Sequence, residues 1–103
     1  MPEITQEMRD EVKEIVFNFF AEECEVDRET LNDNTRIIED LEGDSLMFLE
    51  LLEIFKKKYK LTVTVESIGK HVMKHPADTV GKIVDLVLLI IQHGEKISEL
   101  GQG

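Results

Sequence analysis

Residues 44–59 read DSLMFLELLEIFKKKY and contain the clearest helical pattern in the chain. Large apolar side chains recur at every third position, with one more beside them: Leu46, Leu49, Leu52, Phe55 and Leu51. Side chains three and four positions apart lie on one face of an α-helix. Gly43, just before this run, can adopt backbone conformations that other residues avoid. The pattern predicts an amphipathic helix that begins at Asp44 or Ser45 and ends near Tyr59.

Three further helices are predicted on either side of this segment. Residues 5–24 place apolar side chains at helical spacing, which is typical of a helix with one buried face. A short helix over 65–74 should end before Pro76, because the residue before a proline is pushed out of the helical region. A last helix over 78–93 should stop at Gly94.

The remaining segments are predicted to be loops. Residues 25–43 show no helical repeat and contain turn-forming residues at 32–34, so we expect a long ordered loop pinned to the core. Residues 61–65 have a strand-like alternation, but one short run does not make a sheet. The chain is therefore predicted to be all-α, a four-helix bundle with a long first loop and a short third helix. We expect a single domain over 1–103 with a flexible tail at 94–103.

Charge and composition narrow the classes of function. The 103 residues include 22 acidic and 12 basic side chains, a net charge of −10, which argues against binding nucleic acid through a basic face. Residues 1–55 hold 17 of the acids and 4 of the bases. The longest apolar run, 83–91, is far shorter than the roughly 20 residues that span a bilayer as a helix. With one cysteine, Cys24, and no secretory signal at its start, the protein is expected to be cytoplasmic and monomeric.

No catalytic or metal-binding constellation stands out in the sequence. His71 and His75 lie four residues apart but lack the intervening glutamate of a zinc-protease helix, so we interpret both as surface histidines. Asp40, Glu42 and Asp44 are similar to the start of a calcium loop, but its glycine is missing from the required position. No nucleophile has a base beside it, and no phosphate-binding loop is present. We expect neither an enzyme nor a metal protein.

The stretch EDLEGDSL at residues 39–46 offers the chemistry that remains. Ser45 lies at the predicted start of a helix, where unpaired backbone N–H groups and the helix dipole would stabilise a phosphate ester. Taken alone, Asp44 or Ser45 is equally well explained as an N-terminal helix cap.

The wider pattern resembles the acyl carrier protein family, in which a serine within Glu-Asp-Leu-Gly-x-Asp-Ser-Leu carries 4′-phosphopantetheine. The resemblance covers roughly residues 8–90 and rests on VKEIV at 12–16, Val26, IIEDL at 37–41, DSL at 44–46, Glu50-Leu51, and Thr79-Val80-Gly81 to Asp85. It implies the same four-helix bundle that periodicity predicts. It also implies that Ser45 is the modified residue and that Asp44 assists the magnesium-dependent synthase. Acyl groups would then travel as thioesters on the pantetheine thiol, with no catalysis by the carrier itself.

The resemblance implies two further sets of residues. The second helix would present side chains to partner enzymes: Leu46, Met47, Glu50, Glu53, Lys56 and Lys57. A sheltered acyl chain would lie among residues that are equally ordinary core positions: Ile38, Leu49, Leu52, Ile68 and Val72. The implied partners are a phosphopantetheinyl transferase and acyltransferases, ketosynthases or ligases with basic docking patches.

Several residues depart from the family pattern. Gly43 follows Glu42 where the family places its glycine first, Met47 stands where an acid is typical, and Phe48 where a small polar residue is common. The lysines at 56–58 stand where acids often continue, which would weaken steering toward basic patches or simply complement the helix dipole. With a longer first helix and third-helix segment, these departures predict a specialised carrier, for an unusual or long acyl chain.

Two alternatives stay open at this point. An aminoacyl or polyketide carrier would share the attachment at Ser45 and differ only in its cargo and enzymes. A small acidic helical interaction module would carry no prosthetic group, so a transfer assay with coenzyme A separates it from the carriers.

Overall fold

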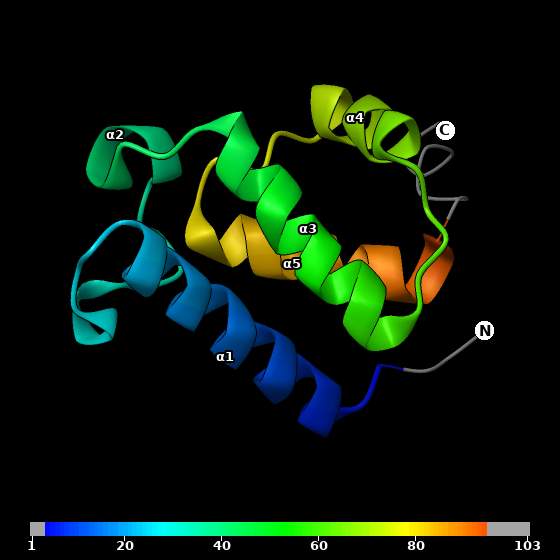
Figure 1. Ribbon diagram of the computed structural model, residues 1–103, viewed down its shortest axis with the longest axis horizontal. Coiled ribbons are helices and arrows are strands. Elements are labelled where there is room, and N and C mark those ends of the chain that lie inside the picture. The colour runs from blue at the N-terminus through cyan, green and yellow to red at the C-terminus, as the bar shows by residue number, and fades with distance from the viewer. Residues whose placement is uncertain (1–3, 95–103) are drawn as a thin grey trace.

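The structure is a computed structural model that describes residues 4–94, except for the side chain of Ser45, and this range is helical apart from its connecting loops (Figure 1). Its elements are α1 (Gln6–Glu23), the 3-10 helix η1 (Arg28–Thr30), α2 (Ile37–Leu41), α3 (Ser45–Tyr59), α4 (Val65–Lys74) and α5 (Val80–His93). The all-α prediction is confirmed, and the four predicted helices match α1, α3, α4 and α5 to within two residues at each end. The tail that is expected to be flexible, residues 94–103, lies outside the described range except for Gly94.

Side-chain caps determine where four of the helices begin. Each cap oxygen accepts a hydrogen bond from the backbone N–H three residues further on: Thr5 from Met8 (3.1 Å), Asp44 from Met47 (3.0 Å), Thr64 from Ser67 (3.2 Å) and Thr79 from Lys82 (3.2 Å). A cap of this kind satisfies one of the N–H groups that a helix start leaves unpaired and contributes about 1 kcal/mol. The start of α3 is therefore fixed by Asp44, one residue before Ser45.

The segment between α1 and α3 differs from the uninterrupted loop that the sequence predicts. Residues 25–43 contain η1 and the five-residue helix α2. A helix of little more than one turn is too short to show a periodic pattern, and it needs tertiary contacts to form. Glu42, with φ of 55°, ends α2 in the left-handed conformation.

Backbone hydrogen bonds pin this segment to the start of α5, as the sequence predicts for an ordered loop. Three N–H groups donate to carbonyl oxygens across the junction: Ile37 to Asp78 (3.0 Å), Val80 to Thr35 (2.9 Å) and Gly81 to Asp33 (3.0 Å). An antiparallel bridge between Arg36 and Thr79 lies within it. The junction holds α2 in position relative to α5.

Two adjoining groups of buried side chains stabilise the helices. The larger core joins α1, α3 and α5 through residues that include Val12, Val16, Phe20, Leu51, Phe55, Val80 and Val87. A smaller group, which we call the second core, lies between α3, α4 and α5: Leu52, Val63, Ile68, Leu86 and Ile90. Figure 1 shows α4 on the far side of α3 and α5 from α1. The half-buried Phe48 packs against both groups.

The three-residue ladder of α3 leaves the core toward its N-terminal end. Leu46 and Leu49 are 61% and 38% exposed, whereas Leu52 and Phe55 are buried. Three residues turn an α-helix by about 300°, so a strict three-residue ladder drifts around the axis by about 60° at each step. Leu51, four residues before Phe55, lies on the inner face instead.

Candidate attachment site and adjoining pocket

Ser45 is the first residue of α3, directly after the capping residue Asp44. Asp44 and Leu46, on either side of it, are exposed. The backbone N–H groups of a helix start carry a partial positive charge, so a phosphate ester attached here would lie in a favourable field. The structure places both motif residues at the helix start where the sequence predicts them.

Gly43 lets the chain pass close to α2 immediately before this helix start. Its N–H donates to the carbonyl oxygen of Ile37 at 2.8 Å. A Cβ at residue 43 would lie 2.6 Å from Cγ2 of Ile37 and 3.3 Å from that carbonyl oxygen, closer than carbon atoms pack. The order Glu42-Gly43 therefore has a structural reason: Glu42 ends α2, and Gly43 provides the close approach.

Arg36 neutralises the acids of α2. Its guanidinium pairs with Glu39 and Asp40, and its backbone N–H donates to the Asp40 carboxylate at 2.8 Å. This backbone hydrogen bond, followed by the guanidinium contact, holds the pKa of Asp40 below its usual value. Glu42 and Asp44 have no ion pair within the part of the chain that the structure describes. These two acids therefore contribute the negative charge nearest Ser45 along the chain.

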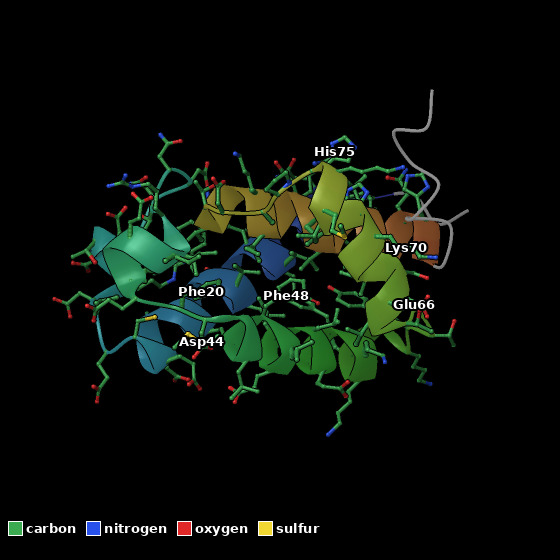
Figure 2. All side chains as sticks on the ribbon, turned by 90° about the horizontal axis from the view of Figure 1, so that it is seen from above. Phe20, Asp44, Phe48, Glu66, Lys70 and His75 are labelled. Carbon is green, nitrogen blue, oxygen red and sulfur yellow. The ribbon has the colours of Figure 1, made fainter. Side chains whose placement is uncertain are left out.

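An apolar pocket of about 330 Å³ opens beside the start of α3, and Asp44 is among its lining residues. Its apolar walls come from all five α-helices: Phe20, Ile37, Ile38, Phe48, Val72, Ile83 and Leu86. Ile38 is 72% exposed and Asp44 is also exposed, whereas Phe20 is 1% exposed. Figure 2 shows Asp44 at the start of α3, with Phe20 and Phe48 in the interior between the helices. The pocket thus leads from the surface next to Ser45 toward the larger core.

The residues predicted to line an acyl site are divided by the structure. Ile38 and Val72 line the pocket. Leu52 and Ile68 belong to the second core, and Leu49 lies partly exposed on α3. The sequence therefore identified the position of the pocket only in part.

Four buried lining residues were not identified from the sequence: Phe20, Ile37, Ile83 and Leu86. Their helical spacing predicts core positions, and spacing does not distinguish a core residue that borders a cavity from one that does not. The sequence did contain one signal of the pocket. Phe48 departs from the family pattern, and its ring lies against the pocket.

The predicted recognition residues follow α3. Four of them are exposed: Leu46, Glu50, Glu53 and Lys57. Met47 is half-buried against the larger core, and Lys56 lies 3.9 Å from the Glu53 carboxylate. Lys58 pairs with Glu11 of α1 at 3.4 Å. Of the three consecutive lysines, only Lys57 has no ion pair among the described residues.

The interpretation of His71 as a surface residue is wrong. It lies three residues after Ile68 on the inner face of α4 and is 5% exposed, with its ring 4.8 Å from that of His75. Within residues 4–94, no cluster of three or more histidine, cysteine or acidic side chains is arranged to hold a metal ion. No helix in this range is long and apolar enough to cross a membrane.

The chain resembles a known protein family over most of its length and a known protein over nearly all of it. Residues 14–87 match the family described as "Phosphopantetheine attachment site". The chain is 47% identical over 102 residues to a protein of Clostridium acetobutylicum named "Acyl carrier protein homolog", and the alignment covers 99% of each chain. A helical fold with such an attachment domain defines a phosphopantetheine-dependent carrier. The chain belongs to the acyl carrier protein family.

Family membership establishes the broad role of the protein. Its prosthetic group is covalently attached 4′-phosphopantetheine, and it is a carrier and not an enzyme. Carriers of this family interact with a phosphopantetheinyl transferase and with enzymes that handle acyl groups. The residues present fit the group, because a helix start favours its phosphate and an apolar pocket opens beside Asp44.

Proposed function

We propose that Ser45 carries the phosphopantetheine arm and that the protein presents acyl intermediates to cytoplasmic enzymes of fatty-acid, related lipid or secondary-metabolite biosynthesis. The observation that supports this function is an apolar pocket that begins at Asp44, next to the first residue of α3. When attached, the arm supplies a terminal thiol that holds acyl groups as thioesters.

The residues around Ser45 hold the attachment point in a defined position. Asp44 caps the first turn of α3 by accepting a hydrogen bond from the N–H of Met47, which fixes the helix start at the residue that would carry the arm. Gly43 fixes the approach of the chain through its hydrogen bond to Ile37. Glu42 and Asp44 add negative charge that a transferase with a basic surface would attract.

The walls of the pocket favour a fatty-acyl cargo over an aminoacyl cargo. Burial of apolar surface gains roughly 0.8 kcal/mol per methylene, so an eight-carbon chain would gain up to about 6 kcal/mol before the cost of widening the pocket. A small aminoacyl group such as alanyl has little apolar surface to bury, and its ammonium group would lose hydration among the apolar side chains of the pocket. Docking of a partner enzyme would then draw the chain out.

Transfer of the arm tests the attachment residue. The protein is incubated with coenzyme A, magnesium and a broad-specificity phosphopantetheinyl transferase, and its intact mass is measured. Wild type should gain one phosphopantetheine, Ser45→Ala none, and the control Ser67→Ala the same as wild type. A gain by Ser45→Ala would place the site elsewhere, and no gain by wild type would contradict the proposed function.

The cargo is tested on the modified protein. Octanoyl-phosphopantetheine should raise the melting temperature above that of the thiol form, whereas an alanyl group should not. A rise in melting temperature with the alanyl group and none with the octanoyl group would favour the aminoacyl carrier.

A further inference from the structure

Phe48 lies between the apolar pocket and the part of the second core that Leu52 and Ile68 form, whereas Leu86 of the second core lines the pocket itself. Phe48 lines the pocket and packs against the second core at the same time. In Figure 2, Phe48 projects from α3 into the interior, with Asp44 and Phe20 on the side toward α2. A chain that enters beside Asp44 and runs along α3 therefore reaches Phe48 before it reaches Leu52.

The helical spacing of α3 explains this order. Asp44, Phe48 and Leu52 are each four residues apart, so they follow one another along nearly the same face of the helix. Each step of four residues advances about 6 Å along the axis. Asp44 and Phe48 line the pocket, whereas Leu52, one step further, is 2% exposed within the second core. The ring of Phe48 thus stands between the pocket and the space that Leu52 and Ile68 fill.

The volume of the pocket limits the chain that it holds. A water molecule takes about 30 Å³ in the liquid, and a methylene is of similar size. The pocket of about 330 Å³ therefore accommodates on the order of ten carbons. Longer chains would have to displace the ring of Phe48 or remain partly in solvent.

We propose that Phe48 is the end wall of the acyl pocket, and that it restricts the sheltered cargo to medium-length saturated chains of roughly eight to ten carbons. This inference rests on the proposed function. Leu52 and Ile68 would line the pocket only in a protein with a small residue at position 48. An apolar cavity of about 150 Å³ accepts a benzene ring, so removal of this ring opens space for roughly two to four further methylenes.

The test measures the melting temperature as a function of chain length. A broad-specificity transferase loads wild type and Phe48→Ala with acyl-phosphopantetheine from acyl-coenzyme A of 4 to 16 carbons. In wild type, the melting temperature should rise with length and stop rising near eight to ten carbons. In Phe48→Ala the unloaded protein should melt lower, and the rise should continue for two to four carbons more. Phe48→Leu, a milder change, should extend the limit by about two carbons.

Two control variants separate the loss of the end wall from general destabilisation. Leu52→Ala weakens the second core behind Phe48, so it should lower every melting temperature and leave the length limit unchanged. Leu49→Ala changes a partly exposed neighbour that does not line the pocket, and it should behave as wild type.

The outcomes distinguish this inference from the function on which it rests. A limit that stays the same in both Phe48 variants overturns the role of Phe48, as does a wild-type melting temperature that shows no dependence on length in a protein that accepts the arm. Failure of wild type to accept the arm at all overturns the proposed function and the inference together.

Discussion

Replacement of Gly81 by alanine should weaken the junction between α5 and the segment that carries α2. A Cβ at residue 81 would lie 2.8 Å from both the Cβ and the carbonyl oxygen of Asp33, and 3.1 Å from its Cα. Backbone atoms cannot rotate away as the end of a long side chain can, so the junction has to open. When the junction opens, the 3.0 Å hydrogen bond from the N–H of residue 81 to the carbonyl oxygen of Asp33 is stretched.

Two opposing effects determine the size of the change. Alanine is more favourable than glycine within a helix by up to about 1 kcal/mol. Forcing a methyl group into a packed site costs about 1–3 kcal/mol, and weakening one hydrogen bond costs about 1 kcal/mol more. The free energy of unfolding should therefore fall by about 2 kcal/mol, which lowers the melting temperature by about 8–16 °C in a protein of this size.

Gly69 provides a matched control in another helix. A Cβ at residue 69, in α4, would meet no atom within 4 Å, so Gly69→Ala should stabilise the protein by about 0.5–1 kcal/mol. Urea unfolding followed by far-ultraviolet circular dichroism measures both variants against wild type. If Gly81→Ala is as stable as Gly69→Ala, the close approach to Asp33 carries no energetic cost and the reasoning is refuted.

Three shorter predictions concern α3 and its contact with α1. Asp44→Ala should lower the free energy of unfolding by about 1 kcal/mol in urea titrations, because the helix loses its cap, whereas Asp44→Asn should change it little; equal losses would contradict the cap. The Tyr59 hydroxyl donates to Glu11 at 2.6 Å, which lowers the pKa of Glu11 from 4.5, while burial and then this bond raise the pKa of Tyr59 from 10.0 to about 12. Because the pKa of Glu11 is lowered, its ionisation stabilises the folded protein above pH 4.5, and because the pKa of Tyr59 is raised, its protonated form stabilises the folded protein below pH 10. The stability advantage of wild type over Tyr59→Phe in urea unfolding should therefore shrink below pH 4.5 and again from pH 10 to 12. An advantage independent of pH would contradict the contact. Lys57→Glu should speed modification by a transferase with a basic surface at low salt, with Lys57→Gln intermediate; a rate difference that persists in high salt would exclude electrostatic steering.

Helix boundaries could be predicted because they depend on neighbours along the chain. Thr79 caps α5 through a hydrogen bond to the N–H only three residues away, and the preference of threonine for this position is local. Pro76 restricts the residue before it, and α4 ends at Lys74. The spacing of apolar residues also predicted the buried faces of α1 and α5, because these two faces pack against each other in the larger core.

The features that could not be predicted depend on contacts between distant segments. α2 is too short to show a repeat, and it is held by the hydrogen bond from Ile37 to Asp78, which is 41 positions further along the chain. The pocket exists because Phe20, Ile37 and Leu86 leave space where their helices meet. A spacing pattern specifies which face of a helix is buried, but it does not specify where two buried faces fail to fill the volume between them.

The charge pattern of α3 shows how the structure refines a sequence prediction. Lys56 and Lys58 each pair with an acid of the protein itself, Glu53 and Glu11, so much of the positive charge in the lysine run is neutralised internally. Lys57 is exposed without such a pair among the described residues, and it lies about 10 Å along the helix from Glu50. We therefore expect an enzyme that docks on α3 to present a basic patch near Ser45 and an acidic group opposite Lys57, about three helical turns further along α3. An enzyme with basic residues along the whole contact would meet Lys57 with like charge, and such repulsion selects partners as effectively as attraction does.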